Sequence, residues 1–158
     1  MPRWKLLIVD DEALARSNLQ LALADHPQWE SCGLAASAAE ARVAMTARPA
    51  DLVLLDIQMP RQNGLSYAAE LATLAEPPLV VFVTAHDEHA LAAFEVHALD
   101  YLLKPFSDTR LSLTLQRAAQ LQGERGVGLL RHEAQLVQLQ RDFLRAARMR
   151  QDVRLLWV

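Results

Sequence analysis

The chain has 158 residues, enough for one ordinary domain and little more, and its 52% hydrophobic and 22% charged residues exclude a disordered protein. A net charge of -3 argues against a strongly basic nucleic-acid-binding chain, and Cys32, the single cysteine, excludes a scaffold of internal disulfides. No apolar run approaches the roughly 20 residues that a membrane-spanning helix needs. We therefore expect a globular protein of the cytoplasm, without a membrane partner.

Five short apolar runs follow one another in the first 122 residues, and segments with helical spacing separate them. Four of the runs are continuous rather than alternating, which is typical of strands buried on both faces of a parallel sheet. In chain order the runs cover residues 6–9, 34–36 (a weak one), 52–55, 79–83 and 101–103.

The intervening segments carry apolar residues three or four positions apart, which lie on one face of a helix. Ser37 and Glu40 have the spacing of a capping box, which predicts the start of the second helix. The other four apolar faces comprise Ala15, Leu19, Ala22 and Leu23; Leu65, Ala68, Ala72 and Ala75; Leu91, Phe94 and Ala98; and Leu111, Leu115 and Ala118. Strand and helix alternate five times, which predicts a doubly wound, five-stranded parallel α/β sheet.

Polar residues directly follow four of the predicted strands. The carboxyl ends of parallel strands share one edge of a sheet, where open α/β proteins bind ligands, so we expect these side chains to meet. They are Asp10, Asp11 and Glu12 after the first strand, Asp56 after the third, Thr84 after the fourth and Lys104 after the fifth.

This set of residues has the chemistry of a phosphoryl-transfer site. Clustered carboxylates repel one another unless a cation lies among them, and ligation by oxygen alone suits Mg²⁺. An aspartate is also a nucleophile toward phosphorus and forms an aspartyl-phosphate. Phosphoryl transfer depends on positioning and charge neutralisation, which a divalent ion, a lysine and a hydroxyl supply.

Each residue also has an ordinary structural explanation. Asp11 alone would be a helix cap, Asp56 a polar strand terminus and Lys104 a solvated side chain. Their joint placement at the strand ends favours the functional interpretation. Cys32 is interpreted as a packing residue, and the absence of a glycine-rich phosphate loop argues against a P-loop or Rossmann enzyme. Four histidines show no metal-ligand spacing: His26, His89, His97 and His132.

Four motifs occur in order at fitting intervals, at residues 9–12, 54–60 with Gly64, 83–85 and 100–106. On these motifs the chain resembles the receiver domain of response regulators in two-component signalling, from about residue 4 to 122. The resemblance implies the flavodoxin-like strand order 2-1-3-4-5. It also implies a phosphorylation-controlled switch rather than a conventional enzyme.

The resemblance assigns the acidic residues to phosphoryl and metal chemistry. Asp56 is expected to accept a phosphoryl group from the phosphohistidine of a partner histidine kinase. Asp11 and Asp56 are expected to ligate Mg²⁺ directly, together with the backbone carbonyl of Gln58, while Asp10 acts largely through water.

The resemblance also implies how the signal leaves the site. Lys104 and Thr84 are expected to bind phosphoryl oxygens, Tyr101 to move inward as Thr84 shifts, and the bond between Lys104 and Pro105 to be cis. We expect the change to promote a homodimer through the face made by the fourth helix, fifth strand and fifth helix. Candidate contacts there are apolar Leu91, Phe94 and Val96 and charged Glu88, Glu95, Arg110 and Arg117.

Residues 11–16, 84–88 and 90–106 are similar to receivers attached to LytTR-type DNA-binding domains, which implies a transcription regulator. A LytTR domain needs about another hundred residues, so DNA contact is expected only through an output domain absent from this sequence. A stand-alone receiver or phosphorelay module is an alternative. An aspartate-nucleophile phosphohydrolase of the haloacid dehalogenase type is a second, but its general acid position holds Gln58, which cannot protonate a leaving group.

The composition changes at Gly123. Residues 1–122 carry 9 basic and 15 acidic side chains, and residues 123–158 carry 7 and 4. We predict a receiver domain over 1–122, followed by a linker helix and the truncated start of an output domain. DNA contact, dimer formation and a solvated helix face all remain open for this tail, whose heptad-spaced apolar and basic residues are Leu129, Leu136 and Phe143, and Arg141, Arg145 and Arg148.

Overall fold

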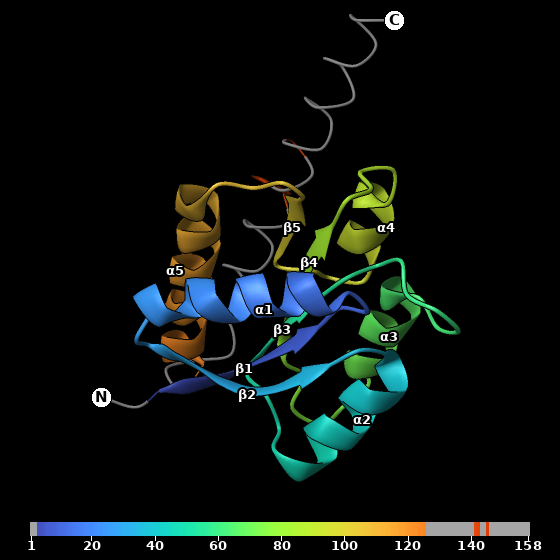
Figure 1. Cartoon of the computed structure of the whole chain (residues 1–158), viewed down its shortest axis with the longest axis horizontal. Helices are drawn as coiled ribbons and strands as arrows, with labels where there is room; N and C mark the ends of the chain where they lie inside the picture. Colours follow the sequence, from blue (N-terminus) through green and yellow to red (C-terminus); the bar gives the residue numbers. More distant parts are fainter. Residues whose placement is uncertain (1–2, 126–140, 143–144, 146–158) are drawn as a thin grey trace, which may run out of the picture.

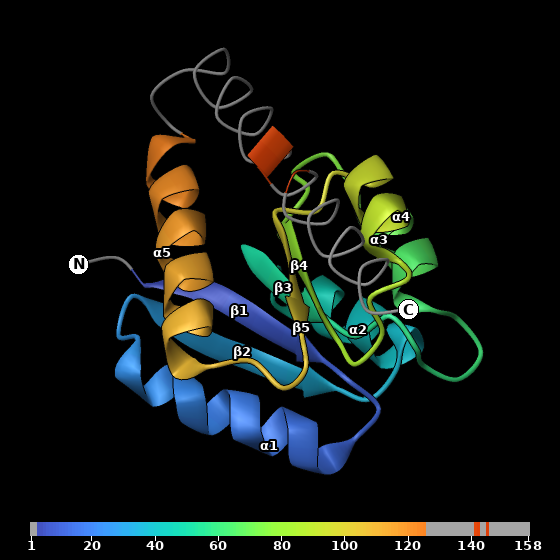
Figure 2. The same ribbon diagram turned by 90° about the horizontal axis from the view of Figure 1, so that it is seen from above.

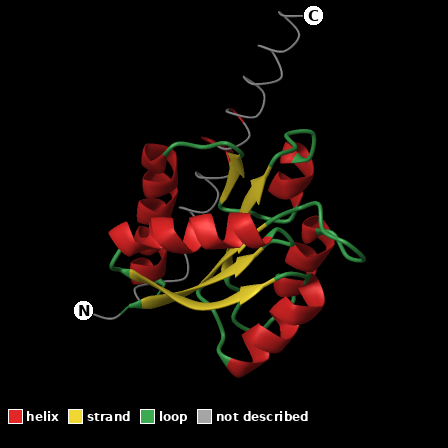
Figure 3. Cartoon of the chain, in the orientation of Figure 1, coloured by secondary structure: helices red, strands yellow, loops and turns green. Residues whose placement is uncertain are grey.

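The computed structural model describes residues 3–125, 141, 142 and 145. Strands and helices alternate along the chain (Figures 1 and 3). In order they are β1 Trp4–Val9, α1 Ala13–Ala22, β2 Trp29–Ala35, α2 Ala38–Ala47, β3 Leu52–Leu55, α3 Gly64–Leu71, β4 Leu79–Thr84, α4 Ala90–Glu95, β5 Asp100–Leu103 and α5 Asp108–Glu124, with a 3-10 turn at Leu23–Asp25. Most of the predicted tail helix, including its heptad residues, lies outside the described residues.

The five strands form one parallel sheet in the order β2-β1-β3-β4-β5, which confirms the predicted architecture. Helices α1 and α5 cover one face, and α2, α3 and α4 cover the other (Figure 2). Because side chains alternate along a strand, Leu6 and Ile8 pack toward α1 and α5, whereas Leu7 and Val9 pack toward the opposite helices. Burial on both faces explains the continuous apolar runs of β1, β3 and β4.

Strand β2 begins at Trp29, five residues before the weak apolar run that predicts it. In the part of the chain that the structure describes, this strand pairs with β1 alone and lies at the sheet edge, where its middle residues are half-buried. Its register shifts where Leu6 pairs with Ser31 and Leu7 with Gly33, which leaves Cys32 as the extra residue of a bulge. A polar, irregular edge strand lacks the apolar pattern of a central one.

The helix starts follow the sequence only in part. The Ser37 hydroxyl accepts a hydrogen bond from the Glu40 N–H at 3.1 Å, as the capping box predicts for α2, although the Glu40 carboxylate accepts from the Ala36 N–H. Helix α1 begins after Glu12, whose side chain makes no capping hydrogen bond. The explanation of Asp11 as a helix cap is therefore wrong.

Two helix ends also differ from the sequence pattern. Helix α3 ends at Leu71, so its predicted continuation to Ala75 is a turn. Helix α5 runs through Gly123 to Glu124, so the predicted boundary falls within its last turn. Within the described ranges, no helix is both long and apolar enough to cross a membrane.

Candidate functional site

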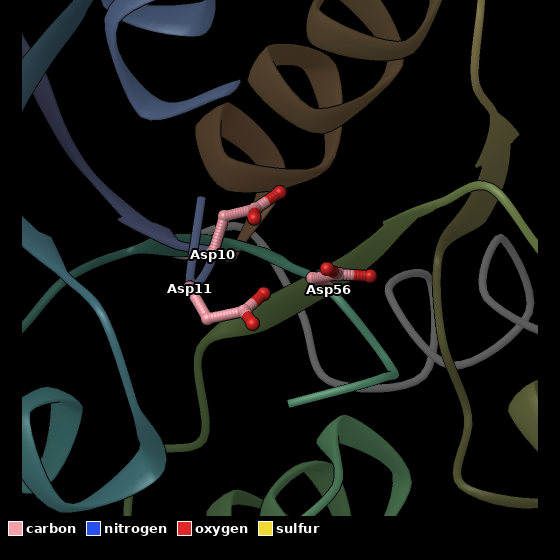
Figure 4. A group of neighbouring side chains, drawn as sticks. All are labelled: Asp10, Asp11 and Asp56. Carbon is pink, nitrogen blue, oxygen red and sulfur yellow. The ribbon is translucent and has the colours of Figure 1, made fainter. Parts of the chain in front are cut away.

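Three carboxylates meet at the carboxyl edge of the sheet, where the strand-end residues are predicted to converge. Asp10 and Asp11 follow β1 and Asp56 follows β3, its neighbour in the sheet. Their side chains extend to one side of the strand ends (Figure 4), and one oxygen from each lies within 4.8 Å of the others. Three hard oxygen ligands at this spacing, two of them buried, fit the requirements of Mg²⁺.

Lys104, at the end of β5, reaches this cluster and neutralises one acid. Its Nζ lies 2.7 Å from Asp10 Oδ2, and the other oxygen of Asp10 accepts from the Glu12 N–H at 2.9 Å. Burial lowers the pKa of Lys104, but the hydrogen bond and charge of Asp10, with the charge of Asp56, outweigh burial and raise it above its ordinary value. Lys104 therefore stays cationic beside the carboxylates.

Among the described acids, Asp56 has the pKa that departs furthest from its ordinary value. The residue is 7% exposed, and its backbone N–H donates to the Val9 carbonyl at 2.9 Å. Burial, reinforced by the charges of Asp10 and Asp11 and partly offset by Lys104, raises the pKa of Asp56 from 3.8 to about 6. A cation among the three carboxylates would reverse this effect and hold Asp56 ionised.

The stability of the metal-free protein should therefore depend on Asp56 ionisation. Because the folded-state pKa lies above the ordinary value, protonated Asp56 stabilises the fold at low pH, and this contribution is lost as pH rises through about 6. We expect Asp56→Asn, which stays neutral, to exceed the wild type in stability by about 1–3 kcal/mol above that pH and to match it below about pH 4. Urea unfolding with EDTA measures both limits, and equal stabilities above pH 6 would contradict the expectation.

The turn after Asp56 closes tightly on the strand end. The Gly64 N–H donates to the Ile57 carbonyl at 2.7 Å, and a Cβ at Gly64 would lie 2.1 Å from the Asp56 carbonyl oxygen. Only glycine allows this approach of the start of α3 to the strand. Gln58 is exposed in this turn, and the role of its backbone carbonyl as a metal ligand stays a prediction.

Thr84 and Tyr101 are joined through the loop after β4. Thr84 is fully buried at the strand end, and its Oγ1 accepts from the His86 N–H at 3.3 Å. The Tyr101 hydroxyl donates to the His86 carbonyl, and its fully buried ring lies 6.4 Å from that of Phe82. Tyr101 is thus already inward, and Lys104–Pro105 is cis as expected.

A second charged cluster lies behind β5 and is not predicted as a unit. Asp100 is buried and accepts two hydrogen bonds of 2.7 Å from the Arg110 guanidinium and one of 2.6 Å from the Thr114 hydroxyl. Burial raises the pKa of Asp100, but these partners outweigh burial and hold it below its ordinary value. Arg110 therefore forms an ion pair within the chain, and its side chain is still 36% exposed, so its place on the rim of a dimer contact stays a prediction. Asp100 is visible in the sequence as the acid that opens the motif at 100–106. No sequence motif identifies Arg110, ten residues later, as its partner.

A family model described as "Response regulator receiver domain" matches residues 6–116. The chain is 45% identical over 129 residues to the transcriptional regulatory protein BtsR of Escherichia coli K12, covering 80% of this chain and 52% of that protein. It is 41% identical over 119 residues to the sensory transduction protein LytT of Enterococcus faecalis, covering 75% and 49%. The chain thus spans about half the length of these relatives.

Among solved structures, the response regulatory domain of the protein mrkE from Klebsiella pneumoniae is similar to this chain. The sequences are 33% identical, the TM-score is 0.73, and the match covers 77% of this chain and 99% of that one.

Proposed function

The chain belongs to the response regulator receiver family, and from this premise we propose that Asp56 accepts a phosphoryl group from a phosphohistidine of a partner kinase. The observation that carries the proposal is the position of Asp56 among Asp10 and Asp11 at the carboxyl edge of the sheet. The test is incubation with acetyl phosphate, with and without Mg²⁺, and intact-mass measurement. One phosphoryl group per chain is expected with Mg²⁺ and none without it.

In the proposed transfer, the phosphoryl group moves from phosphohistidine to Asp56, and the other polar residues at the strand ends hold the ion and the phosphoryl oxygens. An Asp56 carboxylate oxygen attacks phosphorus, the P–O bond forms as the P–N bond of phosphohistidine breaks, and the imidazole leaves with the electron pair. Asp11 and Asp56, with the Gln58 carbonyl and with Asp10 through water, would hold Mg²⁺, which neutralises charge on the phosphoryl oxygens when bound. Lys104 and Thr84 exchange their present partners for those oxygens.

Asp11 provides the more selective test of the metal site, because it is the exposed member of the cluster and is not the transfer nucleophile. We expect Asp11→Ala to weaken Mg²⁺ binding by at least about tenfold, since Mg²⁺ is held by only one or two carboxylates. Calorimetric titration measures the affinity, with Asp25→Ala, another exposed acid, as control. Undiminished binding would refute the assignment of Asp11 as a ligand.

We propose transcription as the output, because similar proteins are named transcriptional regulators. Residues 1–122 would form the receiver and 123–158 a linker helix with the start of an output domain, through which DNA is contacted. The setting would be the cytoplasm, where a kinase supplies the phosphoryl group, and the receiver would act as a switch rather than a conventional enzyme. A stand-alone receiver or phosphorelay module would need no such output domain.

Phosphorylation is expected to tighten a homodimer through the face of α4, β5 and α5. Phe94 and Val96 are half-buried on this face, and Glu95 and Arg117 are exposed beside them. We expect beryllofluoride, a phosphate mimic, to lower the dimer dissociation constant by about tenfold, a coupling of about 1.4 kcal/mol. Sedimentation equilibrium measures the constant, and equal values with and without the mimic would remove support for this route.

Two variants test whether Tyr101 transmits the effect of beryllofluoride on dimer formation, as distinct from merely stabilising the fold. Tyr101→Phe removes only the hydroxyl that donates to the His86 carbonyl, so its ring still fills the core. We expect this variant to show a smaller beryllofluoride effect at wild-type stability. Asp56→Asn, which lacks the acceptor carboxylate, should show no effect of the mimic at all.

A further inference from the structure

Four hydrogen bonds converge on the buried carboxylate of Asp100, at the start of β5. Its Oδ1 accepts from the Tyr101 N–H at 2.8 Å and from Arg110 Nη2 at 2.7 Å. Its Oδ2 accepts from Arg110 Nη1 at 2.7 Å and from the Thr114 hydroxyl at 2.6 Å. Arg110 and Thr114 lie near the start of α5, so a single carboxylate joins the backbone of β5 to that helix.

Tyr101 belongs to this cluster and also to the hydrogen bonds beside the proposed phosphorylation site. Its backbone N–H donates to Asp100, and its hydroxyl donates to the His86 carbonyl. The His86 N–H donates in turn to Thr84 Oγ1 at 3.3 Å, and Thr84 is expected to bind a phosphoryl oxygen. A continuous series of hydrogen-bonded residues therefore runs from Thr84 to α5.

We propose that Asp100 and Arg110 are positioning residues of the phosphorylation switch, which transmit a displacement of Tyr101 to α5. An arginine–carboxylate pair with two parallel hydrogen bonds fixes orientation as well as distance. The side chain of Asp100 is 5% exposed, so water cannot readily replace its partners. When Tyr101 moves, Asp100 moves with it. Separation from Arg110 would leave a buried carboxylate without its counter-charge, which is strongly unfavourable, so α5 follows instead.

Helix α5 is the element through which such a displacement reaches the rest of the chain. It runs from Asp108 to Glu124 and precedes residues 126–158 in the sequence. The Asp100 cluster holds α5 near its first turn, so a shift there changes where the far end of the helix lies. The coupling rests on the proposed function of Thr84 and Tyr101, whereas the four hydrogen bonds of Asp100 do not.

Trp29 provides a reporter of α5 that lies outside this cluster. Its indole N–H donates to the Leu115 carbonyl of α5 at 3.2 Å, and the residue is buried in β2. The NMR frequency of a hydrogen-bonded N–H depends on the length of the bond. The indole signal of Trp29 therefore changes if α5 moves relative to the sheet.

The test is heteronuclear NMR of the full 158-residue chain in Mg²⁺, with and without beryllofluoride. In the wild type we expect the assigned signals of the Thr84 amide and the Trp29 indole both to shift. Asp100→Asn keeps the shape of the side chain but only one acceptor oxygen. We expect it to reduce the Trp29 shift by at least about half and to leave the Thr84 shift unchanged. A residue with a merely structural role would not separate the two signals in this way.

Glu70→Gln is the matched control, because it removes another carboxylate that binds an arginine through two hydrogen bonds. Glu70 of α3 accepts from Arg42 Nε at 2.7 Å and Arg42 Nη2 at 2.9 Å, on the opposite face of the sheet from α5 (Figure 2). This variant should retain the full Trp29 shift. Arg110→Lys, which keeps the charge but not the two parallel bonds, replaces Asp100→Asn if that variant does not fold, and the same reduction is expected.

The two signals separate failure of this coupling from failure of the proposed function. A shifted Thr84 signal with an unshifted Trp29 signal in the wild type would overturn the coupling alone. A full Trp29 shift in the folded cluster variants, or an equal reduction in the Glu70 control, would overturn it as well. An unshifted Thr84 signal in the wild type would overturn the proposed function and the coupling with it. Thermal unfolding followed by circular dichroism shows whether each variant is folded.

Discussion

Replacing Asp56 with asparagine is expected to abolish phosphoryl uptake from acetyl phosphate. The amide preserves the shape of the side chain in its buried position but lacks the anionic oxygen that is proposed to attack phosphorus. It also removes one carboxylate from the acidic cluster, so the variant would lose both the proposed nucleophile and a proposed metal ligand. Intact mass recorded over time with Mg²⁺ should show no added phosphoryl group.

Asp51→Asn is the matched control, since Asp51 lies at the other end of the same strand. Its carboxylate accepts hydrogen bonds from the Lys5 N–H at 2.8 Å and the Gln122 amide at 3.0 Å, far from the acidic cluster along β3. We expect this variant to take up phosphate like the wild type. Uptake by Asp56→Asn at the wild-type rate would place the acceptor on another residue.

Replacing Gly64 with alanine is expected to destabilise the protein by about 3 kcal/mol through overpacking. An added Cβ would lie 2.1 Å from the Asp56 carbonyl oxygen and 2.9 Å from the Asp56 carbonyl carbon and Ile57 Cα. All three atoms belong to the backbone, so no side chain can rotate away. The start of α3 must move, and the strand end that carries Asp56 must move with it. Urea unfolding measures the loss, and Mg²⁺ affinity should fall as well.

Gly123→Ala is the same chemical change, but we expect it to raise the stability of the protein. The added Cβ would lie 3.9 Å from two atoms of the Trp4 ring, an ordinary van der Waals contact, within helix α5. Alanine restricts the unfolded chain and favours the helix, so we expect a gain of about 0.5–1 kcal/mol. If Gly64→Ala also left stability unchanged or raised it, the tight approach at Asp56 would not be a constraint on the fold.

The two buried acids of the cluster, Asp10 and Asp56, differ in how far their charges are compensated by neighbouring groups. Asp10 is bound to Lys104 at 2.7 Å and to the Glu12 N–H, so its charge is compensated inside the protein. Among the described residues Asp56 forms no such ion pair, and burial beside the charge of Asp10 raises its pKa to about 6. The acid whose charge is only partly compensated would be stabilised most by a metal ion, and it is the proposed acceptor.

Much of the fold can be predicted from local patterns of residues. The apolar runs at β1, β3 and β4 are continuous because both faces of these strands are buried. Such a run can be recognised in the sequence before it is known which elements pack against it. Once the strands are parallel, their carboxyl ends must share an edge, so the meeting of Asp10, Asp11 and Asp56 follows from topology. The motif resemblance adds the strand order, which the structure confirms.

The pairing of individual side chains cannot be predicted in this way. Lys104 is 94 residues from Asp10 and binds it because β5 and β1 end at the same edge, at a distance set by the packed sheet. Arg110 satisfies buried Asp100 instead of extending into solvent, since an unpaired buried carboxylate would be costly. His86 joins Thr84 to Tyr101 through backbone groups that have no signature in the sequence. Local patterns therefore specify the elements and the shared edge, whereas these long-range contacts depend on distances that exist only after the elements pack together.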